Sequence, residues 1–144
     1  MDPYDLERFV TAQDAGGTYR QALAELRQGS KRGHWMWFVF PQVAGLGQSP
    51  TSRRYAIATL AEAVAYLQHP VLGPRLLEST AAVAAVEGRT ASDILGGVDA
   101  KKLRSSMTLF RRADPHEPLF QGVLDQYFDG LPDPATEQLL EPGP

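Results

Sequence analysis

Cysteine is absent from the chain. Its absence excludes a disulfide-stapled scaffold, catalysis by a thiol and zinc sites built on thiolates. The chain also lacks an apolar run approaching the ~20 residues of a membrane span, and its N-terminus lacks the charged and apolar regions of a signal peptide. We therefore predict a cytoplasmic protein that does not enter a membrane.

Histidine is scarce, and the three histidines, His34, His69 and His116, lie far apart in the sequence. None is spaced from another histidine or an acidic residue as a helical metalloprotease-like site requires. No nucleophile elbow or triad motif is present either. The sequence therefore predicts no metal and no cofactor, and it identifies no catalytic residue.

An excess of positive charge is also absent. The chain has 14 Lys and Arg against 17 Asp and Glu, a net charge of −3, which disfavours general binding to nucleic acid. Its 144 residues are the size of one domain, and no heptad seam indicates a partner helix. We predict a monomer with one helical domain over residues 1–140 and a frayed, Pro/Gly-rich tail over residues 141–144.

What the chain does have is helical patterning between its Pro and Gly residues. Most segments begin with a capping residue and carry apolar residues three and four positions apart. This pattern predicts a mainly α fold, a compact single-domain array of about seven or eight short helices. The letters WFVF could instead form a short strand. The predicted helices run from Asp2-Pro3 to about Ala12, Thr18 to Gln28, Leu60 to near Gln68, Pro70 to a stop at Gly88, one short turn after Thr90, Asp99 to about Arg112, roughly Glu117 to Asp129, and Pro134 to Leu140.

The segment GHWMWFVFPQ contains both tryptophans of the chain. It can be a buried connector whose rings fill the core, since large aromatic side chains dominate core energetics. It can also be the wall of a pocket, because two indole N–H groups, an imidazole and an amide all need partners when buried. In that case the rings stack a base or a nicotinamide-like ring and the glutamine reads its edge. The candidate ligand-binding residues here are His34, Trp35, Trp37, Phe40 and Gln42.

Two further segments carry candidate residues. The glycine loop Gly45–Ser49 frees backbone N–H groups for an anion, and Ser49, Ser52 and Tyr55 become candidates; alternatively the loop is a flexible turn before a solvated helix start. In KKLRSSMTLF, Ser106 lies near the centre of an apolar helical face, one turn after Lys102. Either both contact a ligand, or the serine bonds back to the carbonyl four residues earlier and the lysine extends to solvent.

Three stretches, HWMWFVFPQVAGLGQSPTSRRYAI, EAVAYLQHPVLGPRL and KKLRSSMTLF, resemble the bacterial family called domain of unknown function 1810. The resemblance spans about Leu6 to Leu140, nearly the whole chain. It implies a small, single-domain, mainly helical fold. The family name assigns no activity.

A second resemblance concerns the order of three elements: a Ser-x-x-Tyr element, a helix that ends at a proline-marked turn, and a later Met-x-x-Phe helix. This order is similar to that of the NADAR family of ADP-ribose-processing N-glycosidases. There the first element carries a glutamate, whereas this chain has Ser52-Arg53-Arg54-Tyr55. The resemblance therefore implies a ligand class, and no catalytic residue.

Two functional hypotheses follow. In the first, the chain binds a nucleotide or an ADP-ribose-like small molecule, and hydrolase or N-glycosidase activity is an extension of that role. In the second, it is a non-catalytic protein-interaction module in which the aromatic segment is an exposed patch or a structural core. A hollow shared by the aromatic segment and the late helix would favour the first hypothesis.

Overall fold

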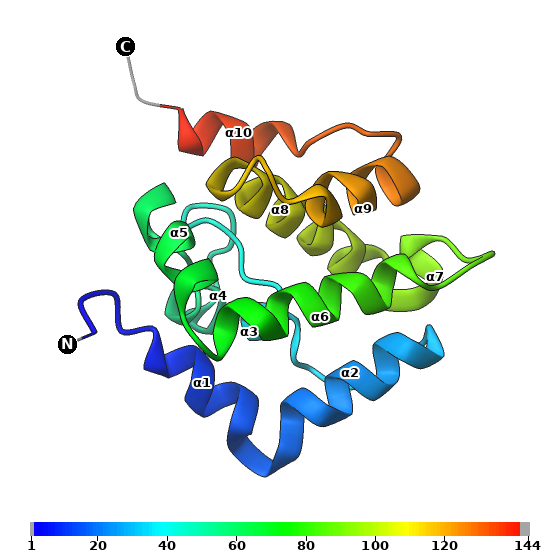
Figure 1. Ribbon diagram of the computed structural model, residues 1–144, viewed down its shortest axis with the longest axis horizontal. Helices are drawn as coiled ribbons and strands as arrows, with labels where there is room; N and C mark the ends of the chain where they lie inside the picture. Colours follow the sequence, from blue (N-terminus) through cyan, green and yellow to red (C-terminus); the bar gives the residue numbers. More distant parts are fainter. Residues whose placement is uncertain (1, 142–144) are drawn as a thin grey trace.

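The structure, a computed structural model, describes residues 2–141, and in these residues it contains α-helices and no strand (Figure 1). The predicted mainly α fold is confirmed. The described residues form ten α-helices, two more than the sequence predicted, because α3 and α4 are single turns that lack a periodic signal. The elements are α1 (Glu7–Asp14), a 3-10 turn η1 (Ala15–Gly17), α2 (Thr18–Gln28), α3 (Met36–Val39), α4 (Pro50–Arg54), α5 (Leu60–Gln68), α6 (Leu72–Ala84), α7 (Ala91–Leu95), α8 (Gly97–Ala113), α9 (Pro118–Phe128) and α10 (Pro134–Leu140).

Helix α8, the longest of these elements, packs against α5, α7, α9 and α10. Helix α6 crosses the molecule and contacts α2, α5 and α9, while α1 packs on α2 and α3 (Figure 1). The apolar faces of these helices form one core. Its largest fully buried rings are Trp35, Tyr66, Phe9, Phe40, Phe110 and Phe120.

Local capping signals place several helix ends where the sequence predicts them. Helix α2 spans Thr18–Gln28 and ends at Gly29, whose φ of 72° is the left-handed conformation that glycine adopts at low cost. The Thr59 and Thr90 side chains accept hydrogen bonds from backbone N–H groups three residues later, and the Thr90–Asp93 capping box is complete. Each of these helix ends depends on residues that are close together in the sequence, so it can be predicted from the sequence alone.

Three predicted helix starts are wrong. The first helix begins at Glu7, because Asp5 adopts a positive φ of 51° and interrupts the chain after Asp2-Pro3. Asp2 still caps it, accepting from the N–H groups of Leu6 and Glu7 at 2.8 and 2.9 Å. Helix α6 begins at Leu72, two residues after Pro70, and α8 begins at Gly97. Asp99 thus lies in the first turn of α8, where it makes ion pairs and does not cap.

The predicted frayed tail, residues 141–144, lies outside the described residues except for Glu141. Among residues 2–141, no helix combines the length and the apolar composition that a bilayer crossing requires.

Candidate functional site

The aromatic segment divides between the core and a half-buried surface. Trp35 and Phe40 are 1% and 0% exposed and belong to the core, whereas Trp37 is half-buried and His34 is exposed. The suggested strand at WFVF is wrong, because Met36–Val39 form one helical turn. Gln13 stabilises this turn by donating to the backbone carbonyl of Phe38 at 2.8 Å.

A buried carboxylate on α2 fixes where this segment begins. Glu25 is 3% exposed, and one of its oxygens accepts from the backbone N–H groups of Arg32 and Gly33 at 2.7 and 2.9 Å. The same oxygen accepts from the Trp35 indole N–H at 2.9 Å, and the other accepts from Gln21 at 2.8 Å. Trp35 is therefore a structural anchor, which leaves Trp37 as the indole available for a ligand.

These hydrogen bonds change the acidity of Glu25. Burial by itself would raise its pKa, but the donors from Gly33 and Arg32, with those from Gln21 and Trp35, outweigh burial and lower the pKa to about 2. The sequence analysis did not identify this residue. Its signal is weak, because Glu25 lies beside the apolar stripe of α2 and resembles an ordinary surface glutamate in sequence.

An ion-pair cluster joins the aromatic segment to α8. Asp99 accepts from Lys31 at 2.8 Å and from Lys102 at 3.3 Å. The Lys102 ammonium also lies over the Trp37 ring, 4.2 Å from its centroid. Lys102 therefore covers one face of this indole and does not extend freely to solvent, since its side chain is 19% exposed. A molecule that contacts Trp37 therefore has to approach the edge of the indole or its other face.

The chain between α3 and α5 forms a loop that is closed at its base. The Ile57 N–H donates to the Gln42 carbonyl and the Ala44 N–H donates to the Ile57 carbonyl, both at 2.8 Å. Within this loop, Ser49 caps α4 and donates to the Ser52 hydroxyl at 2.8 Å. The closed base and the capped helix hold the loop in one conformation, so its inner side can form a fixed wall.

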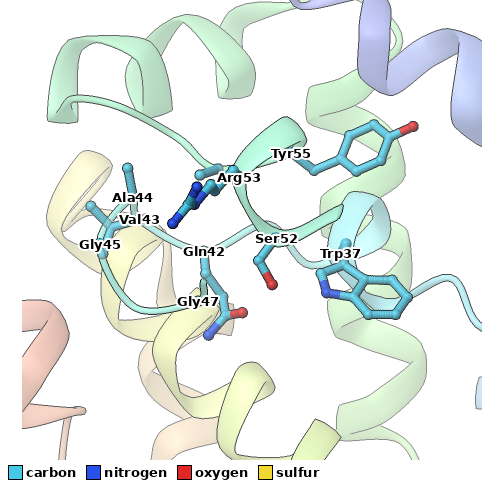
Figure 2. A pocket seen from close by; sticks show the side chains of 10 residues that line it. Trp37, Gln42, Val43, Ala44, Gly45, Gly47, Ser52, Arg53 and Tyr55 are labelled. Carbon is cyan, nitrogen blue, oxygen red and sulfur yellow. The ribbon is translucent and has the colours of Figure 1, made fainter. Parts of the chain in front are cut away.

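A pocket with a volume of about 120 Å³ lies between this loop and α3 (Figure 2). Figure 2 shows the indole of Trp37 turning its nitrogen-bearing edge toward Gln42 and Ser52. The Trp37 Nε1 atom is buried and has no hydrogen-bond partner among the described residues. The lining residues are Trp37, Gln42, Val43, Ala44, Gly45, Gly47, Ser52, Arg53, Tyr55 and Ala56.

Four of the ten sequence-predicted site residues, Trp37, Gln42, Ser52 and Tyr55, line this pocket. Lys102 lies outside the lining and places its ammonium over the Trp37 ring. The structure does not bring the others into the lining. These are His34 on the surface, Trp35 and Phe40 in the core, Ser49 at the cap of α4, and Ser106 inside α8.

Ser106 fits neither interpretation of its sequence position completely. It is fully buried, yet its hydroxyl has no hydrogen-bond partner among the described residues, so the expected bond to the carbonyl four residues earlier is not made. It does not line the pocket, and no other residue of α8 does, so the expected hollow shared by the aromatic segment and the late helix is not this pocket. Arg53 also lines the pocket; its place beside the glycine loop fits an anion site or a solvated helix start equally well, so it was not among the candidate residues.

The lining residues provide hydrogen-bonding groups and one positive charge. Among the described lining residues there is no carboxylate, imidazole or thiol, and the one charged group is the Arg53 guanidinium. In the described part of the chain, no three His, Asp or Glu residues are grouped to hold a metal ion. The pocket offers hydrogen-bond donors, one amide and one positive charge. Such groups can donate hydrogen bonds and pair with a negative charge.

Comparison with known proteins assigns the family. A family model described as "Protein of unknown function (DUF1810)" matches residues 3–140, and the chain belongs to that family. The family predicted from the tryptophan-rich motif is thus confirmed. The chain is similar to the conserved hypothetical protein Rv1873 from Mycobacterium tuberculosis, whose crystal structure has 54% sequence identity and a TM-score of 0.93 over 96% of this chain and 98% of that one. A search of curated proteins gave no match.

Proposed function

We propose that this chain binds a nucleotide-like small molecule, with a ring in the Trp37 pocket and an anionic group at Arg53. An ADP-ribose-like ligand belongs to the same class, as the resemblance to the NADAR family implies. The observation that carries the proposal is the buried, unpartnered indole N–H of Trp37 at the wall of the pocket. A buried donor without a partner costs about 1–3 kcal/mol, and a ligand acceptor would recover that free energy.

The amide of Gln42 supports the same ligand. It lines the pocket, is half-buried, and makes no side-chain hydrogen bond within the described residues. A carboxamide can donate and accept at once, so it can pair with the edge of a heterocycle. Trp37 and Gln42 together provide a directed set of polar groups in a hollow whose lining is polar and apolar in similar measure.

Positive charge at the mouth supports an anionic group on the ligand. Arg53 and Arg54 are exposed neighbours on α4, and neither makes an ion pair with a described carboxylate. Arg53 donates to Gln48 at 3.1 Å, which turns its guanidinium along the loop (Figure 2). In a chain with a net charge of −3, the unpaired Arg53 at a pocket whose described lining contains no acid supports an anionic group on the ligand.

Binding is better supported than hydrolysis. General acid–base catalysis needs a titratable side chain within hydrogen-bond reach of the reacting atoms. Among the described lining residues no Asp, Glu or His provides one. An N-glycosidase activity would require such a group to come from beyond this lining.

The alternative is a non-catalytic protein-interaction module in which the aromatic segment is an exposed patch or a structural core. Trp35 and Phe40 do lie in the core, but an exposed aromatic patch lacks a supporting surface. The large apolar side chains that are exposed in the described part of the chain are Tyr4, Val98, Leu131 and Leu139. None of them belongs to the aromatic segment. We therefore favour small-molecule binding for that segment.

Thermal shift and calorimetric titration with 5′-mononucleotides, nicotinamide mononucleotide and ADP-ribose test this proposal. At 100 times its dissociation constant, a ligand adds about 2.7 kcal/mol to the free energy of unfolding. We expect at least one compound to bind, Trp37→Phe to weaken it about fivefold through loss of one donor, and Arg53→Gln to weaken it about tenfold through loss of a charged one.

Matched controls separate site effects from general ones. Tyr4→Phe removes a polar group from an aromatic side chain outside the pocket, and Arg20→Gln removes an exposed arginine charge elsewhere. Both should bind the ligand like the parent chain. The proposal is wrong if no compound binds, or if Trp37→Phe and Arg53→Gln bind as well as these controls.

A further inference from the structure

The buried indole N–H of Trp37 limits how a ligand can enter the pocket. The Nε1 atom is buried, so an acceptor on a ligand reaches it only after part of the surrounding structure moves. The turn that carries Trp37 is held in place by the hydrogen bond from Gln13 to the Phe38 carbonyl. Trp35, which precedes this turn, is anchored on Glu25. The loop that forms the facing wall of the pocket is the part left to move.

Residues 45–48, the middle of that loop, are held less firmly than its two ends. The ends are fixed by the backbone pairing with Ile57 and by the cap of α4. Residues 45–48 make no backbone–backbone hydrogen bond within the described part of the chain. The Leu46 side chain packs against the core, and the exposed Gln48 accepts a hydrogen bond from Arg53. Because a segment with so few contacts moves at low free energy, this stretch can shift while the rest of the loop stays in place.

The C-terminal helix supports this stretch from outside the pocket. A Cβ added at Gly45 would lie 3.3 Å from the Leu139 side chain, and the three heavy atoms nearest to it all belong to Leu139. Gly45 lines the pocket, whereas Leu139 does not. The Leu139 side chain thus lies behind the wall that Gly45 forms, and α10 limits how far this wall can retreat.

Helix α10, at the edge of the molecule, is attached to α8 mainly by polar groups (Figure 1). Its buried residue is Thr136, whose hydroxyl is hydrogen-bonded to that of Ser105 at 2.7 Å. Glu137 accepts from Arg111 and Arg112 at 2.6 Å each. The two leucines of α10 are exposed or only partly buried. Water can replace these hydrogen bonds, and a helix of seven residues is not stable by itself, so α10 can leave α8 more easily than a core helix can.

We propose that α10 is a latch for the Trp37 pocket. With α10 docked on α8, Leu139 supports the loop and the pocket stays closed around the indole N–H. With α10 released, residues 45–48 retreat and a ligand can reach that N–H. The proposal rests on the proposed function, because it describes how access to the same site is regulated. The Glu137 ion pairs hold the latch, so high ionic strength should favour the open pocket.

Hydrogen exchange of the free chain, followed by NMR, tests the latch without a ligand. Glu137→Gln removes the charge that holds two arginines of α8, so the released state becomes more populated. We expect the α10 amides and the Trp37 indole N–H to exchange about fivefold faster than in the parent chain. The Trp35 indole N–H, bonded to Glu25 in the core, should keep its exchange rate.

Glu141→Gln is the matched control for this experiment. Glu141 follows α10, is exposed and makes no ion pair within the described residues, so both exchange rates should equal those of the parent. Faster exchange of α10 in Glu137→Gln with an unchanged Trp37 indole would overturn the proposal. Unchanged rates in both segments would overturn it as well.

A pair of leucine variants tests the contact between α10 and the loop. Leu139→Ala should speed exchange of the Trp37 indole N–H about twofold, with a smaller effect on the α10 amides, because the wall loses its outer support. Leu131→Ala changes a leucine that is 58% exposed and lies outside α10, and both rates should match the parent. A Trp37 indole that exchanges equally in the two variants would contradict support of the wall by Leu139.

Stopped-flow binding of UMP or nicotinamide mononucleotide, followed by tryptophan fluorescence, links the latch to the ligand. The association rate constant should be about fivefold higher for Glu137→Gln than for the parent and Glu141→Gln, because the open fraction is larger. Faster indole exchange with an unchanged association rate would show that ligands do not enter by this opening, and would overturn the latch as a regulator. If neither nucleotide bound, the proposed function would fail, while the exchange rates would still decide whether α10 holds the pocket closed.

Discussion

Glu25→Gln is expected to lower the free energy of unfolding by about 2–3 kcal/mol, because charge-assisted hydrogen bonds become neutral ones. The Glu25 carboxylate accepts four hydrogen bonds at 2.7 to 2.9 Å, two from backbone N–H groups and two from Gln21 and Trp35. A glutamine oxygen in the place of the oxygen that accepts from Arg32, Gly33 and Trp35 keeps these three hydrogen bonds but loses the charge that strengthens them. The glutamine NH₂ group then faces the NH₂ group of the exposed Gln21. Urea denaturation of the variant and the parent measures the loss.

The pH dependence follows from the same residue. The pKa of Glu25 is about 2 in the folded chain, below its ordinary value of 4.5, so protons bind the unfolded chain first as the pH falls. The stabilisation is complete above pH 4.5 and is lost as the pH falls from 4.5 towards 2. At 1.36 kcal/mol per pKa unit, this pKa difference contributes about 3 kcal/mol to the free energy of unfolding. Glu25→Gln should lose less stability over this range than the parent.

Glu87→Gln is the matched control, because Glu87 is exposed and makes no hydrogen bond or ion pair within the described residues. Its free energy of unfolding should stay within about 0.5 kcal/mol of the parent. If Glu25→Gln were as stable as Glu87→Gln at neutral pH, Glu25 would not anchor the aromatic segment. The assignment of Trp35 as a structural anchor and Trp37 as the ligand-binding indole would then be wrong.

Gly73→Ala should destabilise the chain by about 3 kcal/mol or more. Gly73 lies in the first turn of α6, and a Cβ there would lie 2.1 Å from the backbone carbonyl oxygen of Leu67 at the end of α5. A backbone carbonyl cannot rotate away as a long side chain can. The two helices would therefore have to separate, which disturbs the packing of the buried Leu72 and Leu76.

Gly122→Ala tests the same substitution where space is available. Gly122 lies in α9, is exposed, and has no heavy atom within 4 Å of an added Cβ. Alanine should stabilise the chain by up to about 1 kcal/mol through its higher helix propensity. The two variants should thus shift the unfolding midpoint in opposite directions. A Gly73→Ala chain as stable as Gly122→Ala would contradict the close approach of α5 and α6.

The helices that sequence reasoning predicted are those whose signals are local. The stripe of α2 and its stop at Gly29 lie within twelve residues, and the Thr90–Asp93 box within four. The single turn α3 has no such signal. Its aromatic and β-branched residues favour a strand. The hydrogen bond from Gln13 to the Phe38 carbonyl and the anchored Trp35 instead stabilise one helical turn. Contacts between distant segments outweigh propensity there.

The candidate site also depends on contacts between distant segments, which the sequence alone does not reveal. Residue type marked both tryptophans as candidates, yet the sequence could not distinguish Trp35 from Trp37, because the difference depends on Glu25 from another helix. It also could not show that α4 turns Arg53 towards the pocket and leaves Ser49 at a cap. These placements depend on how the closed loop returns to Ile57, which is a tertiary property.

The central claim, that the unpartnered Trp37 indole receives a ligand, is tested most directly by NMR of the indole N–H groups. The chain has two tryptophans, so a ¹⁵N-labelled sample gives two indole signals, and Trp37→Phe assigns them by removing one. During titration with UMP or nicotinamide mononucleotide, the Trp37 signal should shift and saturate, while the Trp35 signal, bonded to Glu25, stays in place. A Trp37 signal that does not move at saturating concentrations of either nucleotide, or a shift confined to Trp35, would contradict the claim.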